Sequence, residues 1–145
     1  MLIALRPLAA DDLDALFEQY SDRQSVEMAG IPLRDRPAFD ELWARLMADP
    51  ELAFWAITAD GEIVGNIGFF HPGEVGYLIA REWWGRGIAS QALGLFLAEV
   101  PGDLTAEVRP ANVGSLRVLE RNGFVETGRD ELVHLVLQRS PTLGR

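Results

Sequence analysis

The sequence predicts a mixed α+β domain with the element order β-α-α-β-β-β-α-β-α-β-β. Three observations lead to this prediction. Two apolar segments near the N-terminus have helical spacing, whereas the next three segments have the composition of strands. A glycine-rich turn in the middle of the chain leads directly from a strand into an amphipathic helix. No internal repeat or linker divides the chain, so residues 1–145 are expected to form a single domain.

The first elements follow from apolar spacing and helix-start signals. A strand is expected over residues 2–6, and Asp11 and Asp12 then begin a helix. The apolar side chains of this helix fall on one face: Leu13, Leu16, Phe17 and Tyr20. Residues 21–37 are expected to form a polar loop, after which Pro37 begins a second helix.

The pattern then changes from helical to strand-like. Residues 52–58 and 62–70 are expected to be strands, joined by a hairpin turn at residues 59–61. A third strand follows over residues 74–80. The glycine-rich turn at residues 85–87 connects this strand to the central helix.

The last part of the chain repeats both element types. A strand is expected over residues 103–109, followed by a short helix with Asn112 as its N-cap and Gly123 as its C-cap. Residues 124–127 and 131–138 are expected to form two final strands.

Composition limits the classes of function. The chain has 145 residues, 48% of them hydrophobic, which is enough for one domain with its own core. The net charge of −9 argues against a nucleic-acid partner. The absence of cysteine excludes disulfides and thiolate metal sites, and His71 and His134 lack a ligand-like spacing, so no metal is expected. No apolar run is long enough to span a membrane, and the N-terminus turns acidic too early for a signal peptide, so a cytoplasmic protein is expected.

The glycine-rich turn has the features of a phosphate-binding loop. Gly85 and Gly87 allow the backbone to approach an anion closely, and the first N–H groups of the next helix lack partners within it. The turn is neither a P-loop nor a dinucleotide-binding motif, because it lacks the GKS or GKT ending and has Ser90 where the latter needs a third glycine. A simple strand-to-helix connection with two glycines is the alternative interpretation.

Two motifs resemble the GNAT superfamily of N-acetyltransferases. In WGRGIASQAL, Gly87 and Ala89 match the acyl-coenzyme A loop of that family, while Trp84 replaces the usual Gln or Arg, as in the ribosomal-protein N-acetyltransferase branch. The late helix also matches that branch, at Asn112, Ser115, Glu120, Gly123 and Phe124. The resemblance covers essentially the whole chain and implies a central, mostly antiparallel, twisted sheet.

The resemblance further implies how acetyl-coenzyme A, as the co-substrate, would bind. The strands at residues 74–80 and 103–109 would splay apart, and pantetheine would fill the gap. Leu78 and Ile79 would offer main-chain hydrogen bonds to pantetheine and to the thioester carbonyl, and Asn112 would contact the pantetheine arm. The pyrophosphate would bind the N–H groups of Arg86, Gly87, Ile88, Ala89 and Ser90. Asn112 is equally consistent with a capping role alone.

The candidate catalytic residues are Glu74 and Ser115. Glu74 begins the central strand before a Gly-Tyr pair, and a base there would take the proton of an attacking amine. Strand alternation places Tyr77 on the face opposite Glu74. Many GNAT enzymes have a tyrosine acid where this chain has Leu119, so Ser115 is the expected substitute as donor to the departing thiolate. The alternatives are that Glu74 is a solvated strand end and that Ser115 bonds a backbone carbonyl.

Three functions are consistent with these features. The first is acetyl-coenzyme A-dependent transfer to a primary amine, either a protein N-terminus or a small molecule, by direct attack on the thioester. The second is a non-catalytic acyl-coenzyme A-binding regulatory module, suggested by Leu119. The third, a plain nucleotide-binding domain, is disfavoured by the element order. The acceptor pocket is expected between the early helices, their connection and the last hairpin, in a monomer or a homodimer.

Overall fold

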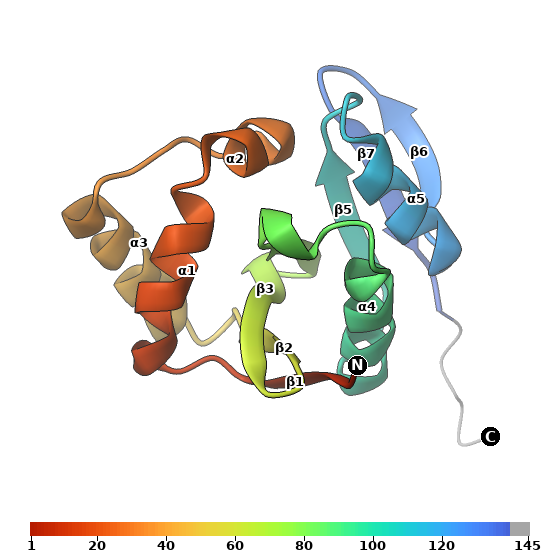
Figure 1. The fold of residues 1–145 in the computed structure, drawn as a ribbon. Coiled ribbons are helices and arrows are strands. Elements are labelled where there is room, and N and C mark those ends of the chain that lie inside the picture. Colours follow the sequence, from red (N-terminus) through yellow and green to blue (C-terminus); the bar gives the residue numbers. More distant parts are fainter. Residues whose placement is uncertain (140–145) are drawn as a thin grey trace.

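The protein consists of one twisted sheet with helices packed on both of its faces (Figure 1). The structure is a computed structural model and describes residues 1–139. Seven strands form the sheet in the order β1-β2-β3-β4-β5-β7-β6. The strands are β1 (Ile3–Pro7), β2 (Phe54–Ala59), β3 (Glu62–His71), β4 (Glu74–Ile79), β5 (Leu104–Val108), β6 (Val125–Arg129) and β7 (Val133–Leu137).

The helices form two groups. The first group is α1 (Leu13–Tyr20), α2 (Arg23–Ala29) and α3 (Arg36–Ala48), and the second is α4 (Ile88–Glu99) and α5 (Val113–Arg121). Short 3-10 turns at Ala10–Asp12 (η1) and Arg81–Trp83 (η2) precede α1 and follow β4. The predicted order of strands and helices is therefore confirmed, with one helix added.

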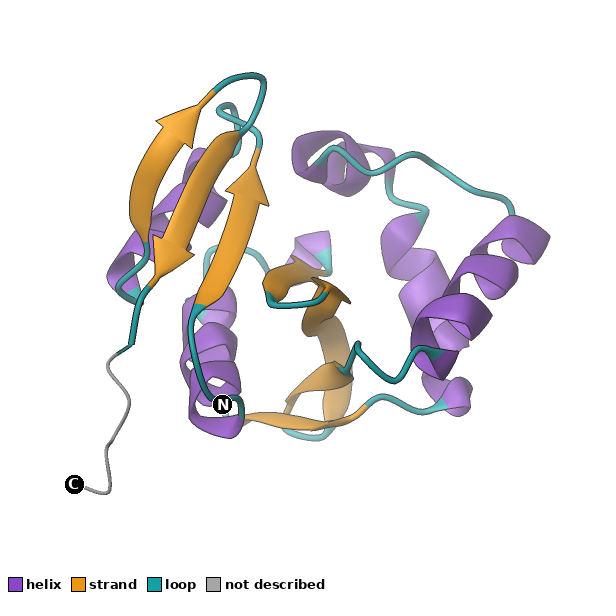
Figure 2. Cartoon of the chain, turned by 180° about the vertical axis from the view of Figure 1, so that it is seen from behind, coloured by secondary structure: helices purple, strands orange, loops and turns teal. Residues whose placement is uncertain are grey.

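Each group of helices covers its own core. On one face, α4 and α5 pack against most strands of the sheet, and the core between them includes Ile67 of β3 and Leu93 and Phe96 of α4, which are fully buried. On the other face, α1 and α3 pack an aromatic cluster against β2, β3 and β4, with Trp43 at its centre. Figure 2 shows that β5, β7 and β6 have no helix over the face turned to the viewer.

The strands β4 and β5 separate soon after they meet. They are the only parallel pair in the described sheet, and their register contains the single partnership of Glu74 with Thr105. Every other neighbouring pair is antiparallel and extends over several residues. The main-chain groups of β4 beyond Glu74 thus lack a partner strand on the β5 side, and the predicted splayed pair is confirmed.

Helix α2 corrects the prediction of a polar loop over residues 21–37. The Asp22 carboxylate caps it by accepting bonds from the Ser25 N–H (3.1 Å) and hydroxyl (2.7 Å). Gly30 ends it in the left-handed region, with φ of 75°, and Val26 is fully buried. The cap and the terminal glycine were readable signals, but a helix of seven residues contains too few apolar side chains to show a period.

Candidate functional site

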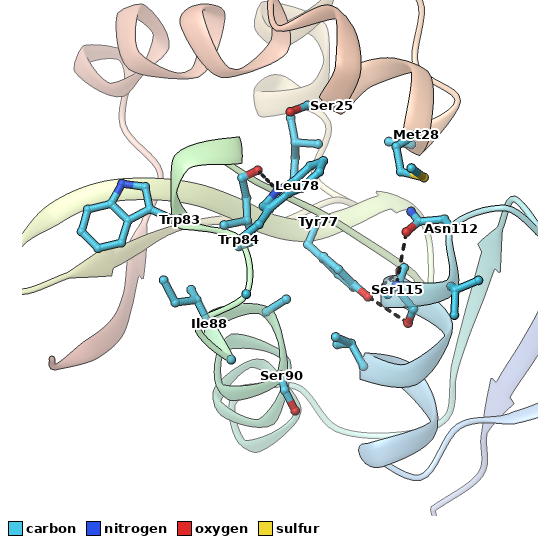
Figure 3. A pocket seen from close by; sticks show the side chains of 18 of the residues that line it. Ser25, Met28, Tyr77, Leu78, Trp83, Trp84, Ile88, Ser90, Asn112 and Ser115 are labelled. Carbon is cyan, nitrogen blue, oxygen red and sulfur yellow. Dashed lines mark hydrogen bonds between the residues drawn. The ribbon is translucent and has the colours of Figure 1, made fainter.

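One pocket of about 530 Å³ lies where β4 and β5 diverge (Figure 3). Its walls come from the end of β4, the loop after η2, the first turn of α4 and one face of α5. Helix α2 contributes Ser25, Met28 and Ala29. Most of the predicted site residues line it: Leu78, Ile79, Gly87, Ile88, Ala89, Ser90, Asn112 and Ser115. The pocket therefore joins both helix groups through the gap in the sheet.

The loop before α4 has the geometry of an anion cradle. Gly85 and Gly87 adopt φ of +78° and +76°, a region that favours glycine, and a Cβ at either position would meet no atom within 4 Å. The first main-chain bond into α4 is from the Gln91 N–H to the Gly87 carbonyl (3.2 Å). The N–H groups of Ile88, Ala89 and Ser90 precede this bond, so they are free donors at the positive end of the helix dipole.

Two residues of β4, Tyr77 and Ile79, direct their main-chain groups into the gap. The Ala80 N–H donates to the Val64 carbonyl of β3 (2.8 Å), so by alternation the groups of Leu78 also point toward β3, while those of Tyr77 and Ile79 point toward β5. Consistently, a Cβ on Gly65 of β3 would lie 2.3 Å from the Leu78 oxygen. Of the two residues predicted to bond pantetheine through their main chain, only Ile79 therefore faces the gap.

Two tryptophans shape the loop. The Trp84 indole N–H donates to the Ile79 carbonyl (2.8 Å), which leaves the Ile79 N–H as the free group of that residue. The Arg86 guanidinium stacks over the Trp83 ring at 4.7 Å and is not part of the pocket wall. Only the main chain of Arg86 thus remains a candidate for phosphate binding.

Arg121 at the end of α5 supplies a positive charge that the sequence analysis missed. It lines the pocket together with Gly114 and Val118. These three positions are four and three residues apart, so they share one helix face, and the packing of α5 turns this face to the pocket.

The first turn of α5 positions the two polar side chains predicted there. The Asn112 amide oxygen accepts a bond from the Ser115 N–H (3.2 Å), which confirms Asn112 as the N-cap. This bond leaves the NH₂ group of Asn112 for a ligand. The Ser115 hydroxyl lies 2.6 Å from the hydroxyl of Tyr77, which reaches α5 from β4. Tyr77 is therefore a site residue, although in the sequence its Gly-Tyr pair had served only to mark Glu74.

Glu74 lies apart from this pocket. It is half-buried at the start of β4, and about 13 Å of extended strand separate it from Leu78. Burial, together with the negative charge of Glu107, raises its pKa above the usual carboxyl range. A carboxylate with a raised pKa is a stronger base, which suits the predicted role.

Next to Glu74, His134 of β7 connects two acidic side chains on the uncovered face of the sheet. Its ring nitrogens lie 2.8 Å from Glu107 and 3.0 Å from Asp130. The bond to Asp130 and the negative charge of Glu107 raise the pKa of His134. The uncovered face of the sheet beside Glu74 therefore carries several carboxylates.

Helix α2 is attached to the pocket by two contacts. The Asp22 carboxylate pairs with Arg81 of η2 (2.9 Å), and this hydrogen bond lowers the pKa of Asp22 to about 2. On the other side of the gap, the Arg109 guanidinium donates to the Glu27 carbonyl. The helix that the sequence analysis missed thus closes one wall of the pocket.

Comparison with known proteins identifies this arrangement. The family model described as "Acetyltransferase (GNAT) domain" matches residues 3–125. The chain belongs to the GNAT acetyltransferase family. The predictions of a GNAT fold and of an acetyltransferase that uses acetyl-coenzyme A are thereby confirmed at the level of the family.

Individual relatives are more distant. The chain is 28% identical over 149 residues to a probable N-acetyltransferase, YjcK, of Bacillus subtilis, an alignment that covers 87% of this chain and 82% of the relative. Among solved structures, the aminoglycoside acetyltransferase AAC(6')-Ib in complex with coenzyme A has a TM-score of 0.81 at 18% identity, covering 95% of each chain. The spermidine N-acetyltransferase from Vibrio cholerae with coenzyme A and spermine has a TM-score of 0.77 at 17% identity, covering 94% of this chain and 95% of that one. These structural likenesses establish the fold.

No helix within residues 1–139 is both long and apolar enough to cross a membrane. The same residues contain no group of three or more His, Asp or Glu side chains that could hold a metal ion.

Proposed function

We propose that this protein transfers the acetyl group of acetyl-coenzyme A to a primary amine, by direct attack of the amine on the thioester. One observation carries the proposal: a single pocket extends from the free N–H groups of α4 through the gap between β4 and β5 to α2. A cofactor with a phosphate end and a thioester end fits such a pocket, and the gap gives an amine access from the opposite face of the sheet.

The residues along the pocket suit the parts of acetyl-coenzyme A. The N–H groups at the start of α4 would bind the pyrophosphate, with Arg121 adding a positive charge. The free N–H groups of Tyr77 and Ile79 in the gap would bond pantetheine and the thioester carbonyl. A donor held against that carbonyl stabilises the negative charge that forms when the amine attacks, as an oxyanion hole does.

Glu74 is the proposed base. Its raised pKa favours proton uptake, and its place at the point where β4 and β5 part gives it access to the gap. The distance along the strand to Leu78, about 13 Å, implies that the proton passes through water. The proton leaves the amine as the new C–N bond forms and the C–S bond breaks.

The acceptor is a small-molecule or peptide amine. The acidic side chains on the acceptor side, Glu74, Glu107 and Asp130, favour a cationic molecule. Structural neighbours were solved with spermine and with kanamycin, which are amines of this kind. A peptide N-terminus, as in the ribosomal-protein N-acetyltransferase branch that Trp84 and the late helix resemble, is the other acceptor class.

Release of free coenzyme A tests the proposal. The assay presents acetyl-coenzyme A with spermine, kanamycin or a peptide with a free N-terminus, and calorimetry measures coenzyme A binding in parallel. We expect binding together with turnover on at least one amine, and a loss of about 10²-fold in kcat for Glu74→Gln. Binding without turnover on any amine would favour the regulatory module, and no binding of either coenzyme form would refute the proposal.

A further inference from the structure

The Tyr77 and Ser115 hydroxyls form a close pair inside the pocket (Figure 3). Their oxygens are 2.6 Å apart, although the two residues are 38 positions apart in the sequence. Tyr77 reaches this position because alternation along β4 turns its side chain to the face covered by α4 and α5. The pair connects the strand that would bind the thioester with the first turn of α5.

The Ser115 hydroxyl can donate its proton into the pocket when Tyr77 donates to the Ser115 oxygen. In the part of the chain that the structure describes, its hydroxyl has no hydrogen-bond partner other than Tyr77. Tyr77 has one hydroxyl proton, and among residues 1–139 the only other acceptor in its reach is the Ser115 carbonyl, at 3.4 Å. When Tyr77 donates to the Ser115 oxygen, the Ser115 proton is directed elsewhere, and the pocket is the open side.

The position where many GNAT enzymes carry a tyrosine is closed to this role. Leu119 lies one helical turn after Ser115 and is 1% exposed, within the core between α5 and the sheet. The tyrosine hydroxyl that lines the pocket belongs to Tyr77, on the β4 wall opposite α5.

On the basis of the proposed function, we propose that Tyr77 is a positioning residue that holds the Ser115 hydroxyl so that its proton points at the sulfur of coenzyme A. Ser115 hydrogen-bonds the sulfur as the C–S bond breaks and negative charge collects there. Tyr77 supports this bond by donating its own hydrogen bond to the Ser115 oxygen. Both hydroxyls keep their protons throughout the reaction.

Proton affinities decide between a hydrogen bond and complete transfer. Burial raises the pKa of Tyr77 to about 12, whereas a thiol has a pKa of about 8.5. Transfer of the Tyr77 proton to the thiolate would be unfavourable by a factor of about 3,000. The thiolate therefore leaves with a hydrogen bond from Ser115, and solvent supplies its proton after release.

The pH dependence of coenzyme A binding tests this role without any acceptor amine. A hydrogen bond to the bound thiolate lowers the pKa of the bound thiol, so the affinity for coenzyme A rises with pH through about 8.5. Acetyl-coenzyme A has no ionisable thiol and serves as the control ligand. Between pH 6.5 and 9.5, we expect the affinity for coenzyme A relative to acetyl-coenzyme A to rise about tenfold in the wild type.

Two variants separate the role of the Ser115 hydroxyl from that of the Tyr77 hydroxyl. Ser115→Ala should abolish the rise, and Tyr77→Phe should reduce it to about threefold, because Ser115 remains but is less well oriented. In turnover, Tyr77→Phe should lower kcat about five- to tenfold, and should have almost no effect when Ser115→Ala is already present. Tyr20→Phe is the matched control: it removes a buried tyrosine hydroxyl bonded to Asn66 (3.0 Å) in the other core. Its effect should add to that of Ser115→Ala.

The outcomes distinguish this inference from the proposed function. If coenzyme A binds but its affinity relative to acetyl-coenzyme A is flat with pH, the role of the hydroxyl pair is refuted while the cofactor site stands. Equal losses from Tyr77→Phe with and without Ser115→Ala would refute it as well. If neither form of the coenzyme binds to folded protein, the proposed function itself fails.

Discussion

A single methyl group at Gly87 tests the phosphate cradle most directly. Gly87 has φ of +76°, and a Cβ there would meet no protein atom within 4 Å, so Gly87→Ala changes only backbone strain and the space in front of α4. The left-handed conformation costs an alanine about 1–2 kcal/mol. A lower entropy of the unfolded chain offsets roughly 0.4–1 kcal/mol of this. The net loss of stability is about 1 kcal/mol, or about 4 °C in the unfolding midpoint.

Gly61→Ala provides a control with the same strain. Gly61 has φ of +87°, also with no atom within 4 Å of a Cβ, but it lies in the β2–β3 turn. Both variants should lose about the same stability. Only Gly87→Ala should bind acetyl-coenzyme A more weakly, because a displaced phosphate loses at least one charged hydrogen bond of about 1.5–3 kcal/mol.

Calorimetric titration with acetyl-coenzyme A is the assay, combined with thermal unfolding of each variant. The loss of one such bond raises Kd by about 10- to 100-fold, whereas Gly61→Ala should stay within about twofold of the wild type. If Gly87→Ala lowers the unfolding midpoint as Gly61→Ala does and still binds with unchanged affinity, the assignment of the loop to the phosphates is refuted.

Three further perturbations address the base, a pH-dependent pair and the core. Wild-type turnover should rise with pH through the raised pKa of Glu74, and this limb of the kcat profile should disappear in Glu74→Gln. Asp130 and Glu107 raise the pKa of His134. Protonated His134 therefore stabilises the fold fully below about pH 6.5, and this stabilisation is lost as the pH rises through the higher pKa of the folded state. In His134→Gln, the urea-unfolding midpoint should no longer fall over this pH range. Trp43, which is 1% exposed and contacts four other aromatic rings, should cost about 3–5 kcal/mol in urea unfolding when replaced by alanine.

Each of these three predictions would be contradicted by one outcome. An unchanged pH profile in Glu74→Gln would assign the base to another group. A wild-type pH dependence of stability in His134→Gln would mean that other groups cause it. A loss below about 1 kcal/mol for Trp43→Ala would show that the aromatic cluster refills the space, contrary to the close packing of the core.

Local signals in the sequence determined most of the fold and one side of the candidate site. Strands and helices appeared as changes of apolar period, and the loop before α4 as two glycines followed by a helix, because these features depend on neighbouring residues. The capping of α5 by Asn112 was readable for the same reason. The short helix α2 was not predicted, because its N-cap and its terminal glycine lie within a polar stretch that shows no apolar period.

Contacts between distant segments were decided only by the tertiary structure. The meeting of Tyr77 with Ser115 depends on how far apart the sheet holds β4 and α5, and the direction of the Ile79 main chain depends on the register with β3. Arg121 faces the pocket, and the Arg86 side chain does not, because of how α5 and the loop pack. A sequence specifies which side chains a strand or helix presents together, whereas the partner across a gap is chosen by register and packing summed over the whole domain.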